Sequence, residues 1–131
     1  MAQPKSYINI NGQTVDGSIE TPSRKFRDAW SYDGKVVSVD PTEKAKIMTR
    51  LIKTECGKRI GDAAADYTQR NMVVAAMFSD ADKALLGKWN IWVSNMKTAC
   101  GSMIDMDDED YEEDYKWPVL GDDVKAFIDA N

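Results

Sequence analysis

The chain has 131 residues, of which 43% are apolar and 30% are charged, which is typical of a soluble globular protein. It contains no histidine, and this removes the usual general base, the commonest zinc ligand and every nucleophile that needs a histidine partner. No run of 18 apolar residues and no secretory signal are present, and two cysteines are too few for a disulfide framework, so we expect a reducing compartment and no membrane span.

The net charge of −5 is unevenly distributed along the chain. Eight of the 22 acidic residues lie between residues 105 and 114, a segment that holds no basic residue. The rest of the chain has 14 acidic residues against 17 lysines and arginines. The sequence therefore describes a mildly basic domain with one acidic segment, which disfavours general nucleic-acid binding.

The first forty residues predict two β-hairpins. The Asn-Gly pair at 11–12 is typical of a type I′ turn between short strands. In the second hairpin, a strand over residues 26–32 leads into the Asp-Gly pair at 33–34, and residues 36–39 form the returning strand. We expect a small sheet of three or four strands with an aromatic face that needs a partner to cover it.

Residues 40–43 predict the beginning of a long helix. Asp40 serves as the N-cap, Pro41 fits the first helical position, and Glu43 completes a capping-box pattern. Gly57 and Gly61 favour a kink or a break. Apolar residues recur at helical spacing in one stripe: Ala45, Met48, Ile52, Cys56, Ile60, Ala63, Tyr67, Val74 and Met77.

A second helix is predicted from Ser79, which caps it. Its apolar stripe is Leu85, Trp89, Trp92, Met96, Cys100 and Met103. If the chain reverses at 78–79, the two helices are antiparallel and Cys56 lies opposite Cys100. We interpret both thiols as small core residues, and a bridge between them is left open. Asp122 is expected to cap a short last helix that carries Val124, Phe127 and Ile128.

The predicted fold class is α+β, with small N-terminal antiparallel β-hairpins packed on a long antiparallel helical hairpin and a short C-terminal helix. We expect one domain over 1–131. Its parts are the β-hairpins (1–40), the helical hairpin (41–104), an acidic loop (105–116), and a linker with the short helix (117–131).

The acidic run that begins at Asp105 does not fit an EF-hand, because positions 110 and 116 hold Asp and Lys instead of the required Gly and Glu. We interpret it as a solvated loop that folding does not require. A second interpretation is a docking segment for a basic partner, because aromatic residues punctuate the acids. The candidate contact residues are Asp107, Asp108, Glu109, Asp110, Tyr111, Glu112, Glu113 and Tyr115.

Two further patterns have a structural and a functional interpretation. Trp89 and Trp92 would suit a sugar or nucleobase pocket, but tryptophans on an apolar helical stripe are usually core. The basic residues Arg24, Lys25 and Arg27 would suit phosphate contacts with aromatic stacking, but we favour a short basic surface turn next to a buried aromatic face. We therefore expect no catalytic residue, no cofactor and no metal site.

The order of motifs resembles small tail-fibre assembly and tail accessory proteins of double-stranded DNA bacteriophages. The resemblance covers roughly residues 24–120. It is carried by Phe26-Arg27-Asp28-Ala29-Trp30, Val37-Ser38-Val39-Asp40, the Phe-Ser-Asp-Ala-Asp-Lys turn at 78–83, Trp89 to Met96, and Trp117-Pro118-Val119. The acidic segment and the two cysteines depart from that pattern. The resemblance implies a protein without an established active site.

The expected function is that of a non-enzymatic tail-associated protein, either a minor virion structural component or a fibre assembly factor. Its expected partners are other tail or fibre proteins, with a homo-oligomer left open. It would reside in the host cytoplasm during assembly, with the virion tail as the other location. An acidic host-directed inhibitor that mimics nucleic acid is the alternative from another class. A small enzyme using lysine or carboxylates is a third, without paired groups to support it.

Overall fold

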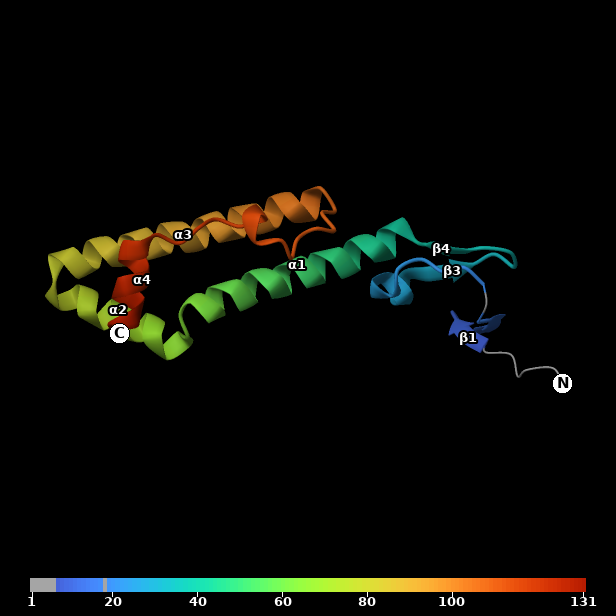
Figure 1. The fold of residues 1–131 in the computed structure, drawn as a ribbon, viewed down its shortest axis with the longest axis horizontal. Helices are drawn as coiled ribbons and strands as arrows, with labels where there is room; N and C mark the ends of the chain where they lie inside the picture. Colours follow the sequence, from blue (N-terminus) through green and yellow to red (C-terminus); the bar gives the residue numbers. More distant parts are fainter. Residues whose placement is uncertain (1–6, 18) are drawn as a thin grey trace. The chain divides into compact units, whose positions relative to one another are not determined.

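The computed structural model describes residues 7–17 and 19–131 (Figure 1). In chain order the elements are β1 (Tyr7–Ile10), β2 (Gln13–Asp16), a 3-10 helix η1 (Arg24–Ala29), β3 (Trp30–Tyr32), β4 (Val37–Val39), α1 (Pro41–Ala63), α2 (Asp66–Phe78), α3 (Asp80–Asp105), a 3-10 helix η2 (Asp114–Lys116) and α4 (Asp122–Asp129). Two antiparallel hairpins precede long helices and a short last helix, so the predicted α+β class is confirmed. The chain divides into two compact units, which meet at the Ile47–Met48 bond and are described separately.

The first hairpin forms as the sequence predicts. β1 and β2 are antiparallel, with Ile10 opposite Gln13. Both turn residues have positive φ, 51° at Asn11 and 82° at Gly12, as a type I′ turn requires. The side chain of Asn9 accepts a hydrogen bond from the Gly12 amide at 2.9 Å and supports the turn.

The second hairpin is shorter than predicted, because residues 24–29 form the 3-10 helix η1 instead of a strand. Ser23 starts this turn: its hydroxyl accepts from the Lys25 amide at 3.3 Å and its carbonyl from the Phe26 amide at 3.1 Å. Only β3 then pairs with β4. The strands therefore make two separate two-stranded sheets, and the expected single sheet of three or four strands is wrong.

Trp30 lies in the core of the N-terminal unit and is only 4% exposed. It packs in a cluster with Ile10, Val15 and Val37, so both hairpins contribute to one small core. The Asn11 side-chain amide donates to the Trp30 carbonyl at 2.8 Å and ties the first hairpin to the second.

The helix α1 begins where the sequence predicts. The Asp40 carboxylate accepts from the amides of Thr42 at 2.9 Å and Glu43 at 3.3 Å. Glu43 does not complete the capping box, because its carboxylate pairs with Lys46 at 3.1 Å and the Asp40 amide donates to Ala29 at 2.8 Å.

The break after α1 differs from the prediction. Gly57 and Gly61 remain helical, and the chain breaks at residues 64–65, where Ala65 precedes α2 without a side-chain cap. After the break, the buried positions of the following helix no longer continue the stripe of α1. The predicted stripe is therefore wrong beyond residue 63: the buried residues there are Ala64, Thr68 and Met72, while Tyr67, Val74 and Met77 are exposed.

The reversal between α2 and α3 lies at Ser79, whose hydroxyl caps α3 by accepting from the Asp82 amide at 3.2 Å. Of the apolar stripe predicted for α3, the buried residues are Trp89, Trp92, Met96, Cys100 and Met103. The Cys56 thiol of α1 donates to the Met96 carbonyl of α3 at 3.8 Å. Cys56 and Cys100 line the same hollow and are both free thiols, so the predicted facing of these positions is confirmed.

The last helix, α4, packs against α2 and α3 through Val124, Phe127 and Ile128, the three residues predicted for it. Its expected cap is wrong: Gly121 precedes the helix, and Asp122 makes no capping bond. The Asn71 amide of α2 donates to the carbonyl of Asn131 at 3.0 Å and holds the end of the chain.

Candidate functional site

The acidic segment joins α3 to α4 and is folded from its first residues. The amides of Met106 and Asp108 donate to carbonyls of the last turn of α3, Ser102 at 3.1 Å and Met103 at 3.0 Å. Asp107 has a φ of 48°, a left-handed conformation that Asp tolerates better than most residues. The segment thus leaves the helix through a defined turn.

Two buried aromatic side chains anchor the acidic segment. Tyr111 and Trp117 are each only 4% exposed, and the Trp117 indole donates to the Tyr111 carbonyl at 2.7 Å. Burial raises the pKa of the Tyr111 hydroxyl, and a hydrogen bond with Glu112 adds to this rise. Most of the loop is solvent-exposed, as predicted, but Tyr111 is a core residue that a deletion of residues 105–114 would remove, which argues against the prediction that folding does not require the loop.

An ion pair closes the loop on itself. Lys116 contacts the Asp108 carboxylate, and both side chains are well covered, at 22% and 11% exposure. The hydrogen bond from Lys116 lowers the pKa of Asp108, and the same bond raises the pKa of Lys116. Asp108 also accepts from the Asp110 amide at 2.9 Å, so this carboxylate is engaged within the loop.

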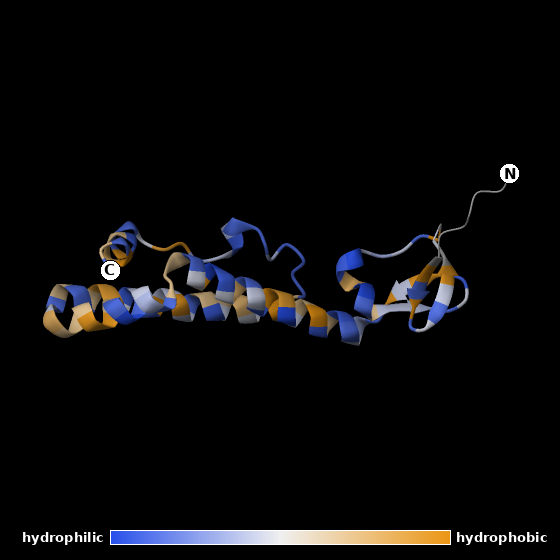
Figure 2. Ribbon diagram, turned by 90° about the horizontal axis from the view of Figure 1, so that it is seen from below, coloured by the Kyte–Doolittle hydropathy of each residue, from blue (hydrophilic) through white to orange (hydrophobic). Residues whose placement is uncertain are grey.

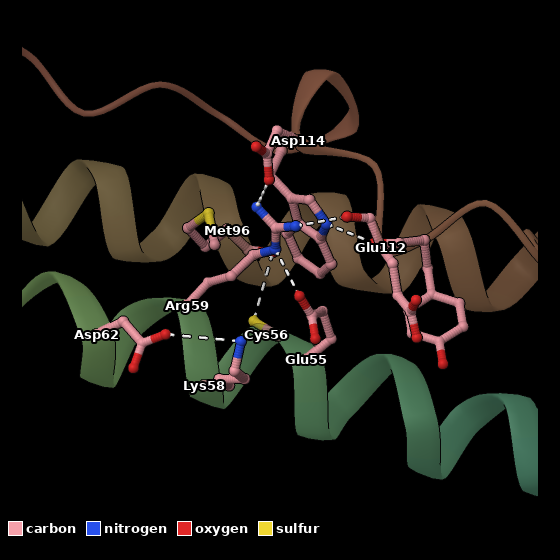
Figure 3. A network of polar contacts seen from close by, with 10 residues as sticks. Glu55, Cys56, Lys58, Arg59, Asp62, Met96, Glu112 and Asp114 are labelled. Carbon is pink, nitrogen blue, oxygen red and sulfur yellow. Dashed lines mark hydrogen bonds and ion pairs between the residues drawn. The ribbon is translucent and has the colours of Figure 1, made fainter.

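Arg59 of α1 ties the loop to the helical scaffold, as Figure 3 shows. Its guanidinium contacts the Glu55 carboxylate at 2.9 Å, the Glu112 carbonyl at 2.8 Å and the Asp114 carboxylate at 3.0 Å. It also lies over the ring of Trp117, 5.3 Å from the ring centre. We call this set of contacts the Arg59 clamp. A planar guanidinium with five donors suits such a forked arrangement, which a lysine cannot reproduce.

The anchored loop presents a row of carboxylates to solvent. The exposed members of the predicted contact set are Asp107, Glu109, Asp110, Glu112, Glu113 and Tyr115, and we call them the acidic ridge. Tyr115 is 78% exposed at the end of the row. Of the two other predicted contacts, Asp108 is the partner of Lys116 and Tyr111 points inward, so both act as supports of the ridge rather than as its surface.

A cleft of about 470 Å³ adjoins the Arg59 clamp. Its lining combines apolar side chains such as Trp92 and Leu120 with charges of both signs, Lys58, Lys125, Asp62 and Asp129. The cleft therefore does not favour a ligand of one sign.

For the two other candidate patterns, the structure supports the structural interpretation over the functional one. Trp89 and Trp92 are buried with ring centres 5.2 Å apart, and the Trp92 indole donates to the Pro118 carbonyl at 3.1 Å. Arg24, Lys25 and Arg27 are exposed on η1. Within residues 7–17 and 19–131, no group of three or more His, Cys, Asp or Glu side chains is arranged to hold a metal ion.

Comparison with protein-family models, curated protein sequences and solved structures finds no match to this chain. In the part of the chain that the structure describes, no helix combines the length and the apolar character needed to cross a bilayer.

Proposed function

We propose that this chain is a non-enzymatic docking protein whose acidic ridge binds a basic partner. The observation that carries the proposal is the contrast within one loop. Tyr111 and Trp117 are buried and Arg59 of α1 holds the loop backbone, while the remaining carboxylates face solvent.

The anchored loop suits binding because it is already ordered. A flexible segment loses conformational freedom when it binds, and this loss weakens the complex. Here the Arg59 clamp and the bond between Trp117 and Tyr111 fix the backbone before any partner arrives. Association therefore retains more of the contact energy.

The charge of the ridge defines the chemistry of the partner. Clustered carboxylates attract lysine and arginine side chains and speed the encounter with a basic surface. The exposed Tyr115 supplies an aromatic contact of the kind enriched at protein interfaces. Basic residues surrounding an apolar patch are the matching surface.

The biological setting of the proposal is the tail of a double-stranded DNA bacteriophage. It is supported by the resemblance of residues 24–120 to tail-fibre assembly and tail accessory proteins. In that setting the partner is another tail or fibre protein, and the chain is a minor virion component or an assembly factor.

The docking chemistry is tested by neutralising the ridge without touching its supports. We expect the triple variant Asp107→Asn, Asp110→Asn, Glu113→Gln to lose most of its binding to a fluorescent oligolysine peptide at low salt. The control variant neutralises three exposed acids elsewhere, Glu20→Gln, Asp28→Asn and Asp66→Asn, and has the same net charge. Equal loss in both variants would show that net charge alone drives binding, and the proposed ridge would be wrong.

The tail setting is tested by quantitative mass spectrometry of purified virions and of tail assembly intermediates from infected cells. We expect the chain in at least one of the two fractions. Its absence from both would refute the tail role. Recovery with a DNA-binding host protein, displaced by added DNA, would favour the nucleic-acid mimic instead.

A further inference from the structure

The outer face of α2 is apolar and uncovered. Tyr67, Val74, Met77 and Phe78 recur at the spacing that places residues on one side of a helix, and they are 63%, 53%, 73% and 85% exposed. Figure 2 shows hydrophobic residues at the end of the helical hairpin where α2 meets α3. The opposite face of α2 is already used, because Thr68 and Met72 are buried there.

An exposed apolar face is unusual on a helix whose other face already packs in the core. Single exposed apolar residues are ordinary, but several large ones that share one side of a helix mark a contact surface. We propose that a second copy of this chain covers this face, with α2 antiparallel to α2 of the copy and Val74 on the twofold axis.

The charges at the two ends of α2 fit this arrangement. Arg70 precedes Val74 by four residues, about 6 Å along the axis, and Phe78, the last residue of α2, follows it by four, also about 6 Å. Asp80 begins α3 two residues later, at the turn between the two helices, which we call the tip. In an antiparallel pair each Arg70 therefore comes level with the tip of the copy, within the reach of its side chain. The tip carries Asp80, Asp82 and one lysine, Lys83, so its net charge opposes that of Arg70.

The twofold arrangement uses this complementarity twice, because each copy supplies one arginine and one tip. Among the described residues, neither Arg70 nor Asp80 forms an ion pair within its own chain. Both remain exposed and available to a copy. Asp66 lies about 12 Å from Val74, beyond the tip of the copy, and does not face its carboxylates.

The size of the apolar face of α2 determines how tightly the dimer is expected to associate. The 13 residues of α2 span about 20 Å. Two such helices bury less surface than a standard stable interface does, so the dimer is expected to be weak and concentration-dependent.

Sedimentation velocity of the full chain over a wide concentration series tests the proposal. We expect reversible dimers that Val74→Glu disrupts, because it places two like charges at the axis, with a dissociation constant raised at least tenfold. The matched control is Val119→Glu, which changes an even more exposed valine, at 87%, outside α2. Circular dichroism confirms that both variants fold.

A charge swap tests the orientation. Arg70→Glu alone weakens the dimer, and adding Asp80→Lys to it restores the dimer. A monomeric wild type throughout the series would overturn the proposal, including the case in which an unrelated protein uses this face. A dimer equally sensitive to Val119→Glu, or one that the double swap fails to restore, would overturn it as well.

Discussion

Replacing Arg59 by methionine removes the clamp and keeps most of the side-chain volume. The lost contacts are a charge-assisted bond to the Glu112 carbonyl, a covered pair with Glu55 and the contact with Trp117. Typical values are about 1.5 kcal/mol for the first and about 0.5 kcal/mol for each of the others. The Asp114 carboxylate adds little, because its side chain is 97% exposed. The expected loss is about 2.5 kcal/mol.

For a chain of this size, such a loss lowers the melting temperature by about 6–10 °C. Circular dichroism follows the helices, and tryptophan fluorescence reports the loosening around Trp117. The matched control is Lys58→Met, which removes the neighbouring charge and an ion pair with Asp62 at 3.7 Å, whose side chains are 65% and 71% exposed. We expect that variant to melt within about 1–2 °C of the wild type. If Arg59→Met melts together with Lys58→Met, the clamp does not hold the loop.

Two other predictions concern neighbouring contacts of the same unit. The pKa of Asp108 is lowered in the folded state, so its pair with Lys116 stabilises the fold above the ordinary aspartate pKa of about 3.9 and is lost as pH falls through the folded value. Lys116→Met should therefore melt lower than the wild type at pH 7, and the difference should shrink as pH falls below the ordinary aspartate pKa; a difference that does not shrink on acidification would contradict the assignment. Trp92→Ala should lower the free energy of unfolding by about 3–5 kcal/mol in urea titrations. Trp92→Phe, which keeps an aromatic ring but loses the bond to Pro118, should cost about 1–2 kcal/mol, and equal losses would show that the bond dominates.

Local chemistry explains which parts of the fold the sequence predicts. Asn11 and Gly12 tolerate positive φ, and this specifies the turn of the first hairpin. Asp40 and Ser79 cap their helices with their own side chains, so these two boundaries were visible. The break before Ala65 has no glycine, proline or capping side chain to announce it, and tertiary packing decides its place.

Only part of the candidate site could be predicted from the sequence, because its other contacts join residues that are far apart along the chain. The acidic residues around Asp110 stand out by composition alone. Arg59 does not, because the Glu112 carbonyl lies 53 positions away along the chain. The spacing of Glu55 and Arg59 on one helix was the one local signal for the clamp. Tyr111 was counted as a surface contact because its acidic neighbours suggest exposure, whereas its ring is buried.

The long sequence separation within the clamp also orders the events of folding. The hairpin of α2 and α3 joins residues close to Ser79, so it closes a short loop and can form early. Arg59 reaches Glu112 only after both long helices are in place, because the intervening chain must first lose its freedom. We therefore expect the clamp to form late in folding, and changes to it to act mainly on the rate of unfolding.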